Sequence, residues 1–548
     1  MTSLGTTTAT TIAAKAAGLV GHQLTVFRVL ARSGVLTPYS PAALARTALT
    51  LARWGTGPAG GFTAQALLNP DRSGLVDELG ELTFAEIHAR SNAVADGLRD
   101  RGVAAGDGVA ILCRNHRGFV DASLGAAKLG ADVLYLNTAF AGPQLAEVLE
   151  RERPRIVVHD EEFADLLSGS DVPDRLLAWC DSPQPAEDTL ESMAGSRSSE
   201  DLQPPDRSSR VVILTSGTTG TPKGAPRAEA GISAGVALLS RLPLRAGWRT
   251  HVAAPLFHTW GWAHWGLSML LGSTVVVRRR FDPEQCLRTL SEQRCDSLVV
   301  IPVMLQRILQ LPQATLDSFD LSRVEVVAAS GSALPGDLGV QWMDQYGDHL
   351  YNVYGSTEVA YATIADPADL REAPGTAGRT PHQTVVKILD DEGHELPPGQ
   401  SGRIFVGNGI LFEGYTGGGH KDVVDGLMSS GDRGRFDEAG RLFVEGREDE
   451  MIVSGGENVF PKEVEDCLTR HDAVVEAAAI GVEDEDFGAR LRAFVVLTGP
   501  GAASEDDLKD HVKANLARFK VPREIVFVDE LPRNATGKVV KTELADES

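Results

Sequence analysis

The sequence predicts an α/β protein with a large N-terminal domain of βα-wound sheets, a β-rich subdomain and a small α+β domain at the C-terminus. Three patterns along the 548 residues lead to this prediction. Helix-periodic stretches alternate with short apolar runs from residue 71 to about residue 340, as in βα units with largely parallel sheets. Short alternating strands with tight turns follow, and a compact mixture of helices and strands begins beyond Arg447.

The region from residue 71 to 340 combines two periodicities. Apolar residues at every third or fourth position predict helices, whereas apolar runs of four or five residues predict buried strands. We expect helices at residues 84–98 and 118–129, and strands at residues 108–112, 133–136, 156–159 and 211–214. The alternation of the two element types supports the parallel sheets.

The pattern after residue 340 predicts different architecture. In the β-rich subdomain we expect strands at residues 385–389, 402–406 and 440–444. Beyond it we expect helices at residues 461–470 and 505–516, and strands at residues 474–480, 492–497 and 525–528. We therefore divide the chain into an N-terminal extension (1–70), a main domain (71–448) and a C-terminal domain (449–548).

The composition is typical of a soluble globular protein. Hydrophobic residues make up 43% and charged residues 23% of the chain, which argues against disorder and fibrous repeats. A formal net charge of −23 argues against a nucleic-acid partner. The five cysteines contain no CxxC pair, so the sequence predicts neither a zinc cluster nor a disulfide framework and fits a reducing cytosol.

The first 70 residues differ in charge from the rest. They contain no acidic residue, and their cations are Lys15, Arg28, Arg32, Arg46 and Arg53. Residues 24–32 and 42–53 place apolar residues at helical spacing with arginines between them, as helices at a membrane surface do. This pattern predicts a peripheral membrane contact through residues 1–60; packing of these helices on the main domain and an organelle transit peptide remain alternatives. The apolar stretch at residues 263–277 is shorter than the roughly 20 residues of a transmembrane helix, so we expect none.

The strongest chemical signal is the segment Thr215-Ser-Gly-Thr-Thr-Gly-Thr-Pro-Lys-Gly224, directly after the strand at residues 211–214. Its glycines let backbone N–H groups turn toward an anion, its hydroxyl side chains donate further hydrogen bonds, and its lysine adds a positive charge. It lacks the GK[ST] spacing of a Walker A loop. The segment predicts a polyphosphate site formed by Thr215, Ser216, Gly217, Thr218, Thr219, Gly220 and Lys223.

This segment resembles the phosphate loop of the adenylate-forming superfamily, which includes acyl-CoA synthetases, luciferases and peptide-synthetase adenylation domains. Further motifs of the superfamily follow in order along residues 71–548. They are Pro255–Gly261, Gly331–Pro335, Tyr354–Glu358, Ser430–Asp432, Gly446–Asp449, Ser454–Pro461 and Leu531–Lys538. Among these enzymes the chain is most similar to the fatty-acid–CoA ligases.

The resemblance implies an ATP site with a magnesium ion. Glu358 and Thr215 are similar to the metal-binding positions, and carboxylate oxygen suits a hard cation. Tyr354 resembles the residue that stacks on adenine, and Asn352 resembles the residue that bonds the adenine amino group. The other residues expected at the nucleotide are Gly355, Ser356, Thr357 and the ribose-binding pair Asp432 and Arg447.

The resemblance also implies a moving C-terminal domain. Lys538 is similar to the catalytic lysine whose ammonium stabilises the charge that develops as a carboxylate attacks the α-phosphorus of ATP. Asp449 matches the hinge about which this domain swings between an adenylating pose and a thioester-forming pose. In the second pose Gly455 and Gly456 are expected to leave room for the pantetheine arm of coenzyme A.

The acid side is marked by His258, to which we assign a catalytic role beside Lys538. It lies in a motif that resembles the aromatic lining of the carboxylate pocket, so we expect an apolar pocket. The residues expected to line it are His258, Trp260, Trp262, Gly331 and Val353. The absence of an aspartate between Pro255 and Trp265 favours an acid without an α-amino group.

The resemblance implies an ATP-dependent acyl-CoA synthetase, an acid–thiol ligase that forms acyl-AMP and then the coenzyme A thioester. We expect medium- to long-chain fatty acids as substrates and a cytoplasmic enzyme at the membrane periphery. Because only ten residues follow Lys538, coenzyme A is a simpler expected acceptor than an attached carrier domain. The alternatives are an aromatic-acid–CoA ligase, a fatty acyl-AMP ligase feeding a carrier protein, a β-lactone synthetase and a ligand-binding member without turnover; the oligomeric state stays open.

Overall fold

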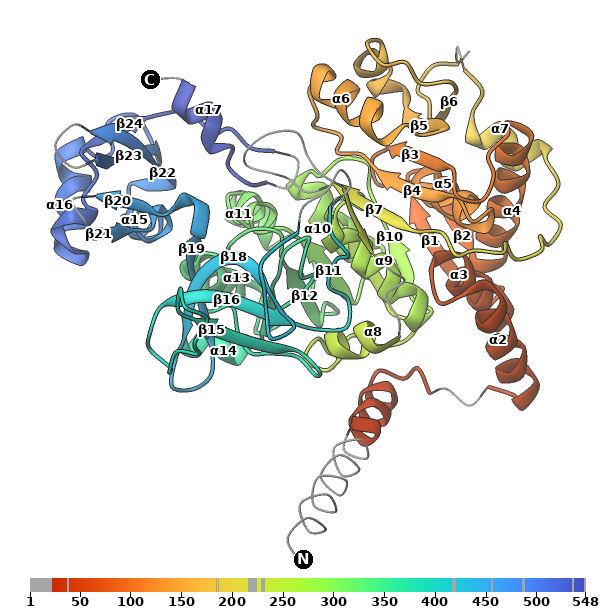
Figure 1. Ribbon diagram of the computed structural model, residues 1–548, viewed down its shortest axis with the longest axis horizontal. Helices are drawn as coiled ribbons and strands as arrows, with labels where there is room; N and C mark the ends of the chain where they lie inside the picture. Colours follow the sequence, from red (N-terminus) through yellow and green to blue (C-terminus); the bar gives the residue numbers. More distant parts are fainter. Residues whose placement is uncertain are drawn as a thin grey trace, which may run out of the picture.

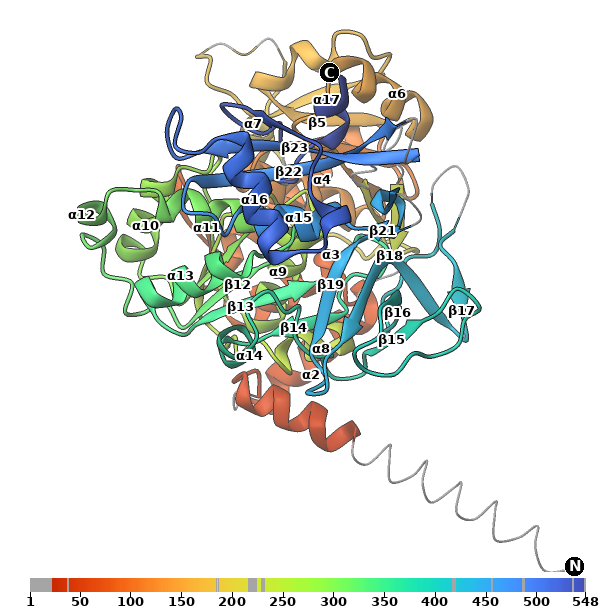
Figure 2. The ribbon, with the colours of Figure 1, turned by 90° about the vertical axis from the view of Figure 1, so that its left-hand side faces the viewer.

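The structure is a computed structural model, shown in Figure 1. It describes residues 22–36, 39–183, 185, 187–214, 224–227, 232–415, 420–454, 457–484, 488–534 and 537–546. Two mostly parallel sheets form the centre of the main body. The C-terminal elements gather to one side of it, and the N-terminal helices lie at its margin (Figures 1 and 2).

The first sheet has eight strands in the order β14-β13-β12-β11-β9-β10-β1-β2. The strands are β1 (Ser73–Asp77), β2 (Gly80–Thr83), β9 (Arg249–Val252), β10 (Thr274–Val276), β11 (Ser297–Val300), β12 (Val326–Ala329), β13 (Leu350–Tyr354) and β14 (Thr363–Ala365). The strands from β13 to β1 pair in parallel, and the edge strands β14 and β2 pair antiparallel. The carboxyl ends of β9, β11, β12 and β13 therefore meet at one edge of the sheet.

The second sheet has six strands in the order β6-β5-β3-β4-β7-β8. They are β3 (Gly108–Leu112), β4 (Asp132–Tyr135), β5 (Ile156–Asp160), β6 (Arg175–Trp179), β7 (Val211–Leu214) and β8 (Gly224–Arg227). All pair in parallel except β7 with β8. The predicted βα-wound architecture with largely parallel sheets is confirmed.

Helices connect and cover these sheets. In the first half they are α4 (Phe84–Asp100), α5 (Arg117–Lys128), α6 (Gly142–Glu152) and α7 (Leu190–Ser196). In the second half they are α8 (Ile232–Leu239), α9 (Thr259–Leu271), α10 (Pro283–Glu292), α11 (Pro302–Leu309), α12 (Gln313–Leu316), α13 (Gly336–Tyr346) and α14 (Pro367–Glu372). Side chains near the first turn cap several of these helices. Helix α4, for example, begins at a capping box in which the Thr83 and Glu86 side chains each accept a hydrogen bond from the other residue's backbone N–H.

The β-rich subdomain is a five-stranded antiparallel sheet. Its strands are β15 (Val385–Leu389), β16 (Gly402–Gly407), β17 (Val423–Val424), β18 (Leu427–Phe436) and β19 (Leu442–Arg447). The Ser430–Asp432 motif, whose residues alone suggest a turn, lies in the middle of the ten-residue strand β18, where Asp432 faces Arg447 of β19. Pairing with two neighbouring strands overrides the turn preference of Ser-Gly-Asp.

The C-terminal elements have a hydrophobic core of their own, formed between residues 452 and 525. They are β20 (Ile452–Ser454), β21 (Glu457–Val459), α15 (Pro461–Leu468), β22 (Val474–Asp484), β23 (Gly488–Leu497), α16 (Glu505–Asn515), β24 (Glu524–Phe527) and α17 (Lys541–Asp546). Contact with the main body includes a hydrogen bond of 3.2 Å from Gln306 Nε2 on α11 to the Val475 carbonyl. In Figure 2 these elements face the viewer.

The N-terminal segment forms a helix over residues 22–32, then α2 (Pro41–Trp54) and α3 (Pro58–Leu68). Helix α3 buries Phe62 and Ala64 in the main body, although it belongs to the extension that we expected to end at residue 70. Helix α2 buries no residue. The division into domains at residues 70 and 448 stays a prediction. No helix among the described residues is long and apolar enough to cross a bilayer.

Candidate active site

The candidate site lies at the carboxyl edge of the eight-stranded sheet. His258 is the N-cap of α9, which follows β9, and Gly331 follows β12. Tyr354 ends β13, and the turn that contains Glu358 comes next. Because β9, β11, β12 and β13 are neighbouring parallel strands, residues far apart in the sequence meet at this edge, where open α/β sheets bind ligands.

The predicted adenine and ribose residues form one hydrogen-bonded group. The Tyr354 hydroxyl donates to Asp432 Oδ2 over 2.5 Å and lies 3.1 Å from Ser430 Oγ. Arg447 Nη1 lies 3.5 Å from Asp432 Oδ1. Asn352 is buried on β13 and donates to the Thr376 carbonyl over 3.4 Å. The structure thus joins β13, β18 and β19 at the place where the sequence predicts the nucleoside.

Burial governs the ionisation of this group. It raises the pKa of Asp432, while Arg447, the Tyr354 hydrogen bond and Lys538 act in the opposite direction. Burial and the neighbouring Asp432 carboxylate raise the pKa of Tyr354, which stays a hydrogen-bond donor. The carboxylate offers further lone pairs beyond the one that Tyr354 uses, so it can accept from ribose hydroxyls.

The predicted magnesium ligand Glu358 is held by a tight turn. A Cβ on Gly355 would lie 2.2 Å from the Ala360 carbonyl oxygen, so only glycine fits here. The Ser356 hydroxyl accepts from the Glu358 backbone N–H over 3.3 Å, and Tyr415 donates to Glu358 Oε1 over 2.7 Å. The predicted residue Thr357 lies in the same turn.

The ionisation of Glu358 suits a cation. Burial by itself raises its pKa, but the hydrogen bonds from Tyr415 and Ser356 and the charge of Lys421 outweigh burial, so the pKa lies below its ordinary value. Glu358 is therefore a carboxylate at neutral pH, and its partly buried oxygens fit a hard divalent cation. Tyr415 was not expected, because it contacts Glu358 from 57 residues along the chain and no local spacing signals that contact.

Lys538 lies in a segment that reaches the main body. The Lys538 N–H donates to Asn534 Oδ1 over 3.1 Å, and the Asn534 N–H donates back to the Lys538 carbonyl over 2.9 Å. A Cβ on the neighbouring Gly537 would lie 2.5 Å from Val303 Cγ1 on α11, so glycine permits this approach.

The charge of Lys538 acts on both sides of the site. It opposes the raised pKa of Asp432 and helps to lower the pKa of His258. The Lys538 residue as a whole is exposed, but the protein around its ammonium displaces water, and this desolvation lowers its pKa. The negative charges of Asp432 and Glu358 act in the opposite direction and limit the fall in pKa. The charge of Lys538 therefore influences the ionisation of the predicted ribose carboxylate and of the predicted acid-side histidine.

The predicted acid pocket is built around the start of α9. Burial, and next the charge of Lys538, lower the pKa of His258 to about 3, so its ring is neutral at pH 7. The Trp260 indole N–H donates to the Val300 carbonyl at the end of β11 over 3.0 Å, which fixes the ring. Trp262 is partly buried, and Val353 is buried in the core. Gly331 lies exposed with a φ of +96°, and a Cβ there would lie 3.1 Å from Ile301 Cγ2.

The predicted hinge residue Asp449 contacts the predicted ribose arginine. Asp449 Oδ1 lies 3.1 Å from Arg447 Nε, so Arg447 faces both Asp432 and the hinge. The adjacent Glu450 lies 2.9 Å from Lys541 Nζ, only three residues beyond Lys538. The predicted hinge is thereby connected to the predicted ribose pair through Arg447 and to the Lys538 segment through Lys541.

Two predicted groups lie outside the described residues. They are the phosphate segment Thr215, Ser216, Gly217, Thr218, Thr219, Gly220 and Lys223, and the coenzyme A residues Gly455 and Gly456. The strands β7 and β8 flank the phosphate segment; β7 pairs with β4 in the second sheet, and β8 pairs with β7 at the edge of that sheet. The roles predicted for the phosphate segment and for Gly455 and Gly456 therefore stay predictions.

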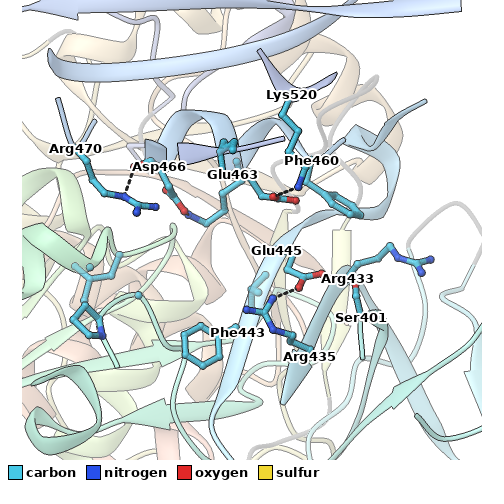
Figure 3. A pocket seen from close by; sticks show the side chains of 17 residues that line it. Ser401, Arg433, Arg435, Phe443, Glu445, Phe460, Glu463, Asp466, Arg470 and Lys520 are labelled. Carbon is cyan, nitrogen blue, oxygen red and sulfur yellow. Dashed lines mark hydrogen bonds and ion pairs between the residues drawn. The ribbon is translucent and has the colours of Figure 1, made fainter. Parts of the chain in front are cut away.

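A cavity of about 660 Å³ lies between the β-rich sheet and the C-terminal elements (Figure 3). Arg435 and Glu445 pair on its lower wall, and Lys520 and Glu463 pair on its upper wall. These ion pairs stay within one wall each. The cavity contains none of the predicted ATP or acid residues, so it is separate from the candidate site.

A buried group of possible metal ligands, away from the predicted ATP residues, is explained by its role in the fold. Cys113, His116 and Asp160 are buried with their ligand atoms close enough to hold a metal ion. His116 Nδ1 accepts the Gly118 N–H at the start of α5, so its other nitrogen, Nε2, carries the proton and donates to Asp160 over 2.7 Å. The histidine is fully used as a helix cap.

Comparison with known proteins agrees with this geometry. The profile of the AMP-binding enzyme family matches residues 62–416, and that of the AMP-binding enzyme C-terminal domain matches residues 463–538. The chain belongs to the AMP-binding enzyme family. It therefore falls within the adenylate-forming superfamily that the motifs predicted, on the acyl-CoA synthetase side.

Its relatives act on different acids. A feruloyl-CoA synthase from Amycolatopsis is 32% identical over 477 residues, which cover 84% of this chain and 93% of that protein. The long-chain-fatty-acid–CoA ligase FadD13 of Mycobacterium tuberculosis is 29% identical over 476 residues, covering 85% and 93%. The crystal structure of ATP-bound MatB from Rhodopseudomonas palustris has a TM-score of 0.79 and 28% identity, and the match covers 90% of this chain and 99% of MatB.

These findings define the general activity. The chain is an AMP-forming acid–CoA ligase of the adenylating type, and enzymes of this type use ATP, Mg²⁺ and coenzyme A. The substrates are small molecules. The relatives do not confirm the expected fatty-acid substrate, because they include ligases of aromatic acids as well as ligases of fatty acids.

Proposed function

We propose that the protein activates an acid with an aromatic or similarly flat apolar body. MgATP converts this acid to the acyl-adenylate with release of pyrophosphate, and coenzyme A then takes the acyl group with release of AMP. The observation that supports the proposed reaction is the close approach of the Lys538 segment to the main body, where a Cβ on the neighbouring Gly537 would lie 2.5 Å from Val303 Cγ1 on α11. The charge of Lys538 influences the pKa of both Asp432 and His258 from there. A cation that spans the nucleotide side and the acid side can stabilise the charge that develops between them.

In this proposal the nucleoside residues orient ATP. Tyr354 stacks on adenine, Asn352 bonds its amino group, and Asp432 with Arg447 holds the ribose hydroxyls. The hydrogen bond from Tyr354 to Asp432 supports this, because it keeps the adenine and ribose residues in one fixed group. Fixed positions reduce the entropy that the reaction must overcome.

Magnesium is assigned to Glu358, with Thr215 as the second predicted ligand. When bound, the ion neutralises phosphate charge and makes pyrophosphate a better leaving group. The neutral ring of His258 then faces the carboxylate without a competing positive charge, and Lys538 supplies the positive charge. The segment 215–223 is proposed to hold the phosphates through its backbone N–H groups.

An aromatic acid is our first candidate because of Trp260. Its indole is held at the edge of the site by the hydrogen bond to Val300, and aromatic side chains around a pocket favour an aromatic ring in the ligand. The similarity to a feruloyl-CoA synthase supports this choice.

A medium- to long-chain fatty acid is the second candidate. It is favoured by the similarity to FadD13 and by the exposed apolar side chains at the N-terminus, among them Leu24 and Phe27, with 62% and 63% of their surface exposed. We propose that residues 1–60 contact a membrane surface peripherally, at the cytoplasmic side, where apolar acids partition.

The test is release of pyrophosphate and AMP with MgATP and a series of acids, with and without coenzyme A. The series runs from acetate to palmitate and includes benzoate, cinnamate and 3-hydroxy acids. We expect thioester formation to be highest with an aromatic acid. Pyrophosphate release without thioester would instead favour a carrier-protein acceptor or a β-lactone synthetase, and binding of ATP without any release would favour a ligand-binding protein.

A further inference from the structure

The segment that follows β16 holds the turn that carries Glu358. Asn408 Nδ2 donates to the Val359 carbonyl over 2.7 Å and to the Tyr361 carbonyl over 2.8 Å. The Phe412 N–H donates to the Glu358 carbonyl over 2.9 Å. Three backbone carbonyls of the turn are therefore fixed by a segment that lies about 50 residues further along the chain.

The turn depends on such support from outside. Ala360 has a φ of +61°, in the left-handed region that residues with a side chain rarely adopt. A residue in this conformation persists only where the surrounding structure holds it. Val359 and Phe412 are buried in one hydrophobic cluster, which packs the turn against the segment. Packing and backbone hydrogen bonds thus keep the turn in place without any contact to the Glu358 carboxylate.

Tyr415, in the same segment, contacts the Glu358 carboxylate itself. Its hydroxyl donates to Oε1 over 2.7 Å, and its ring packs edge-on against Phe412 with centroids 4.8 Å apart. Burial and the neighbouring carboxylate raise the pKa of Tyr415, so its hydroxyl keeps the proton that it donates. The ring contact fixes the phenol, and the hydrogen bond in turn restricts rotation of the carboxylate.

We propose that Tyr415 is a positioning residue for the magnesium ion, because it holds the Glu358 carboxylate in the orientation in which this carboxylate receives the ion. Mg²⁺ demands a nearly ideal octahedral arrangement of oxygens, so a carboxylate that rotates freely binds it less well. Hydrogen-bond partners of metal ligands act in this way in many metal sites. The inference rests on the assignment of magnesium to Glu358 in the proposed function.

The test measures magnesium dependence in two ways on the full-length protein. Calorimetry gives the affinity for ATP with Mg²⁺ and with EDTA, and pyrophosphate release gives the Mg²⁺ concentration for half-maximal rate. The variant Y415F keeps the ring contact with Phe412 and loses the hydroxyl. We expect it to raise the half-maximal Mg²⁺ concentration by about 10- to 100-fold and to weaken ATP binding only when Mg²⁺ is present. ATP binding in EDTA and the KM for the acid should stay unchanged.

The matched control is Y346F. Tyr346 ends α13, and its hydroxyl is buried without a hydrogen-bond partner among the residues that the structure describes. Its loss should leave both magnesium measurements unchanged. The variant E358Q supplies a second comparison: if Tyr415 acts through Glu358, the double variant Y415F/E358Q should need no more Mg²⁺ than E358Q alone.

Two results would overturn the proposal while leaving the magnesium assignment intact. One is an unchanged Mg²⁺ requirement in Y415F when E358Q raises it. The other is an equal loss of ATP affinity in Y415F with Mg²⁺ and with EDTA, which would indicate general damage to the site. An unchanged Mg²⁺ requirement in E358Q would instead refute the assignment of magnesium to Glu358 and the inference with it.

Discussion

The Tyr354 hydroxyl donates a 2.5 Å hydrogen bond to Asp432 Oδ2 and thereby ties the end of β13 to the middle of β18. The two strands belong to different sheets, and Arg447 on β19 lies against the other oxygen of the same carboxylate. Arg447 in turn contacts Asp449, the predicted hinge. The predicted nucleoside site is therefore in physical contact with the predicted pivot of the C-terminal domain.

The first prediction concerns this pair of residues. D432N removes the charge that faces Arg447 and should raise the KM for ATP by about 10-fold or more, since hydrogen bonds to a charged group contribute about 1.5–3 kcal/mol. Y354F keeps the ring and loses one hydrogen bond, so its KM should rise by only about 2- to 10-fold. Pyrophosphate release at varied ATP measures both. A larger effect of Y354F than of D432N would contradict the assignment.

The second prediction concerns Lys538. K538A should reduce the rate of acid-dependent pyrophosphate release by about 100-fold or more, because one oriented positive group is lost from the transition state. Transfer from a supplied acyl-adenylate to coenzyme A should change little. The matched control is K462A, which removes a lysine that pairs with Asp466 on α15 and should leave both rates unchanged. Equal rates for K538A and K462A would exclude Lys538 from the adenylation step.

The third prediction concerns pH. Burial lowers the pKa of His251 to about 4, against about 6.5 in an unfolded chain. The unfolded state therefore binds a proton that the folded state does not, so stability is complete above pH 6.5 and falls between pH 6.5 and 4 by up to about 1.4 kcal/mol per pH unit. H251Q should flatten the dependence of Tm on pH over this window, whatever its Tm at pH 8. Parallel curves for H251Q and the wild type would contradict the burial of a neutral imidazole.

The fourth prediction concerns the N-terminal helices. Leu44 and Leu49 are 51% and 59% exposed on α2, beside Arg46, and no acidic residue precedes Asp71. The double variant L44E/L49E should reduce co-sedimentation with anionic liposomes several-fold, since both apolar burial and charge attraction are weakened. The control is L79E, because Leu79 is 57% exposed on the main body.

A second variant keeps this proposal falsifiable. Deletion of residues 1–56 removes α2 and leaves α3, which buries Phe62 in the core. Co-sedimentation of this variant at the level of the full-length protein would exclude the membrane contact. Loss of binding with the deletion but not with L44E/L49E would assign the contact to the segment before α2.

Much of the fold could be predicted because its signals are local. The apolar runs at β3 (Gly108–Leu112) and β7 (Val211–Leu214) are bounded by polar residues and turn residues, so their limits are visible in the sequence. The strand β18 (Leu427–Phe436) was not predicted, because pairing with β16 and β19 forms it and the Ser-Gly-Asp run within it favours a turn. Long-range packing also buries Phe62 of α3 in the main core, which the charge pattern of the first 70 residues does not signal.

Some residues of the candidate site could be predicted from the sequence, and others could be found only in the folded structure. Glu358, Asp432 and Lys538 could be named from motifs, since the chemistry of ATP demands particular residue types at those places. Tyr415 could not, because its importance comes from a contact made in the folded chain, the hydrogen bond to Glu358. No spacing in the sequence indicates this contact.

The central claim is that the protein joins an apolar carboxylic acid to coenzyme A through an acyl-adenylate. The most direct measurement supplies MgATP and the acid series, with and without coenzyme A, and follows pyrophosphate, AMP and thioester together. The account predicts one pyrophosphate and one AMP per thioester, with an optimum at one class of acid and loss of all three products in K538A. Pyrophosphate and AMP formed in the presence of coenzyme A without any thioester would contradict it.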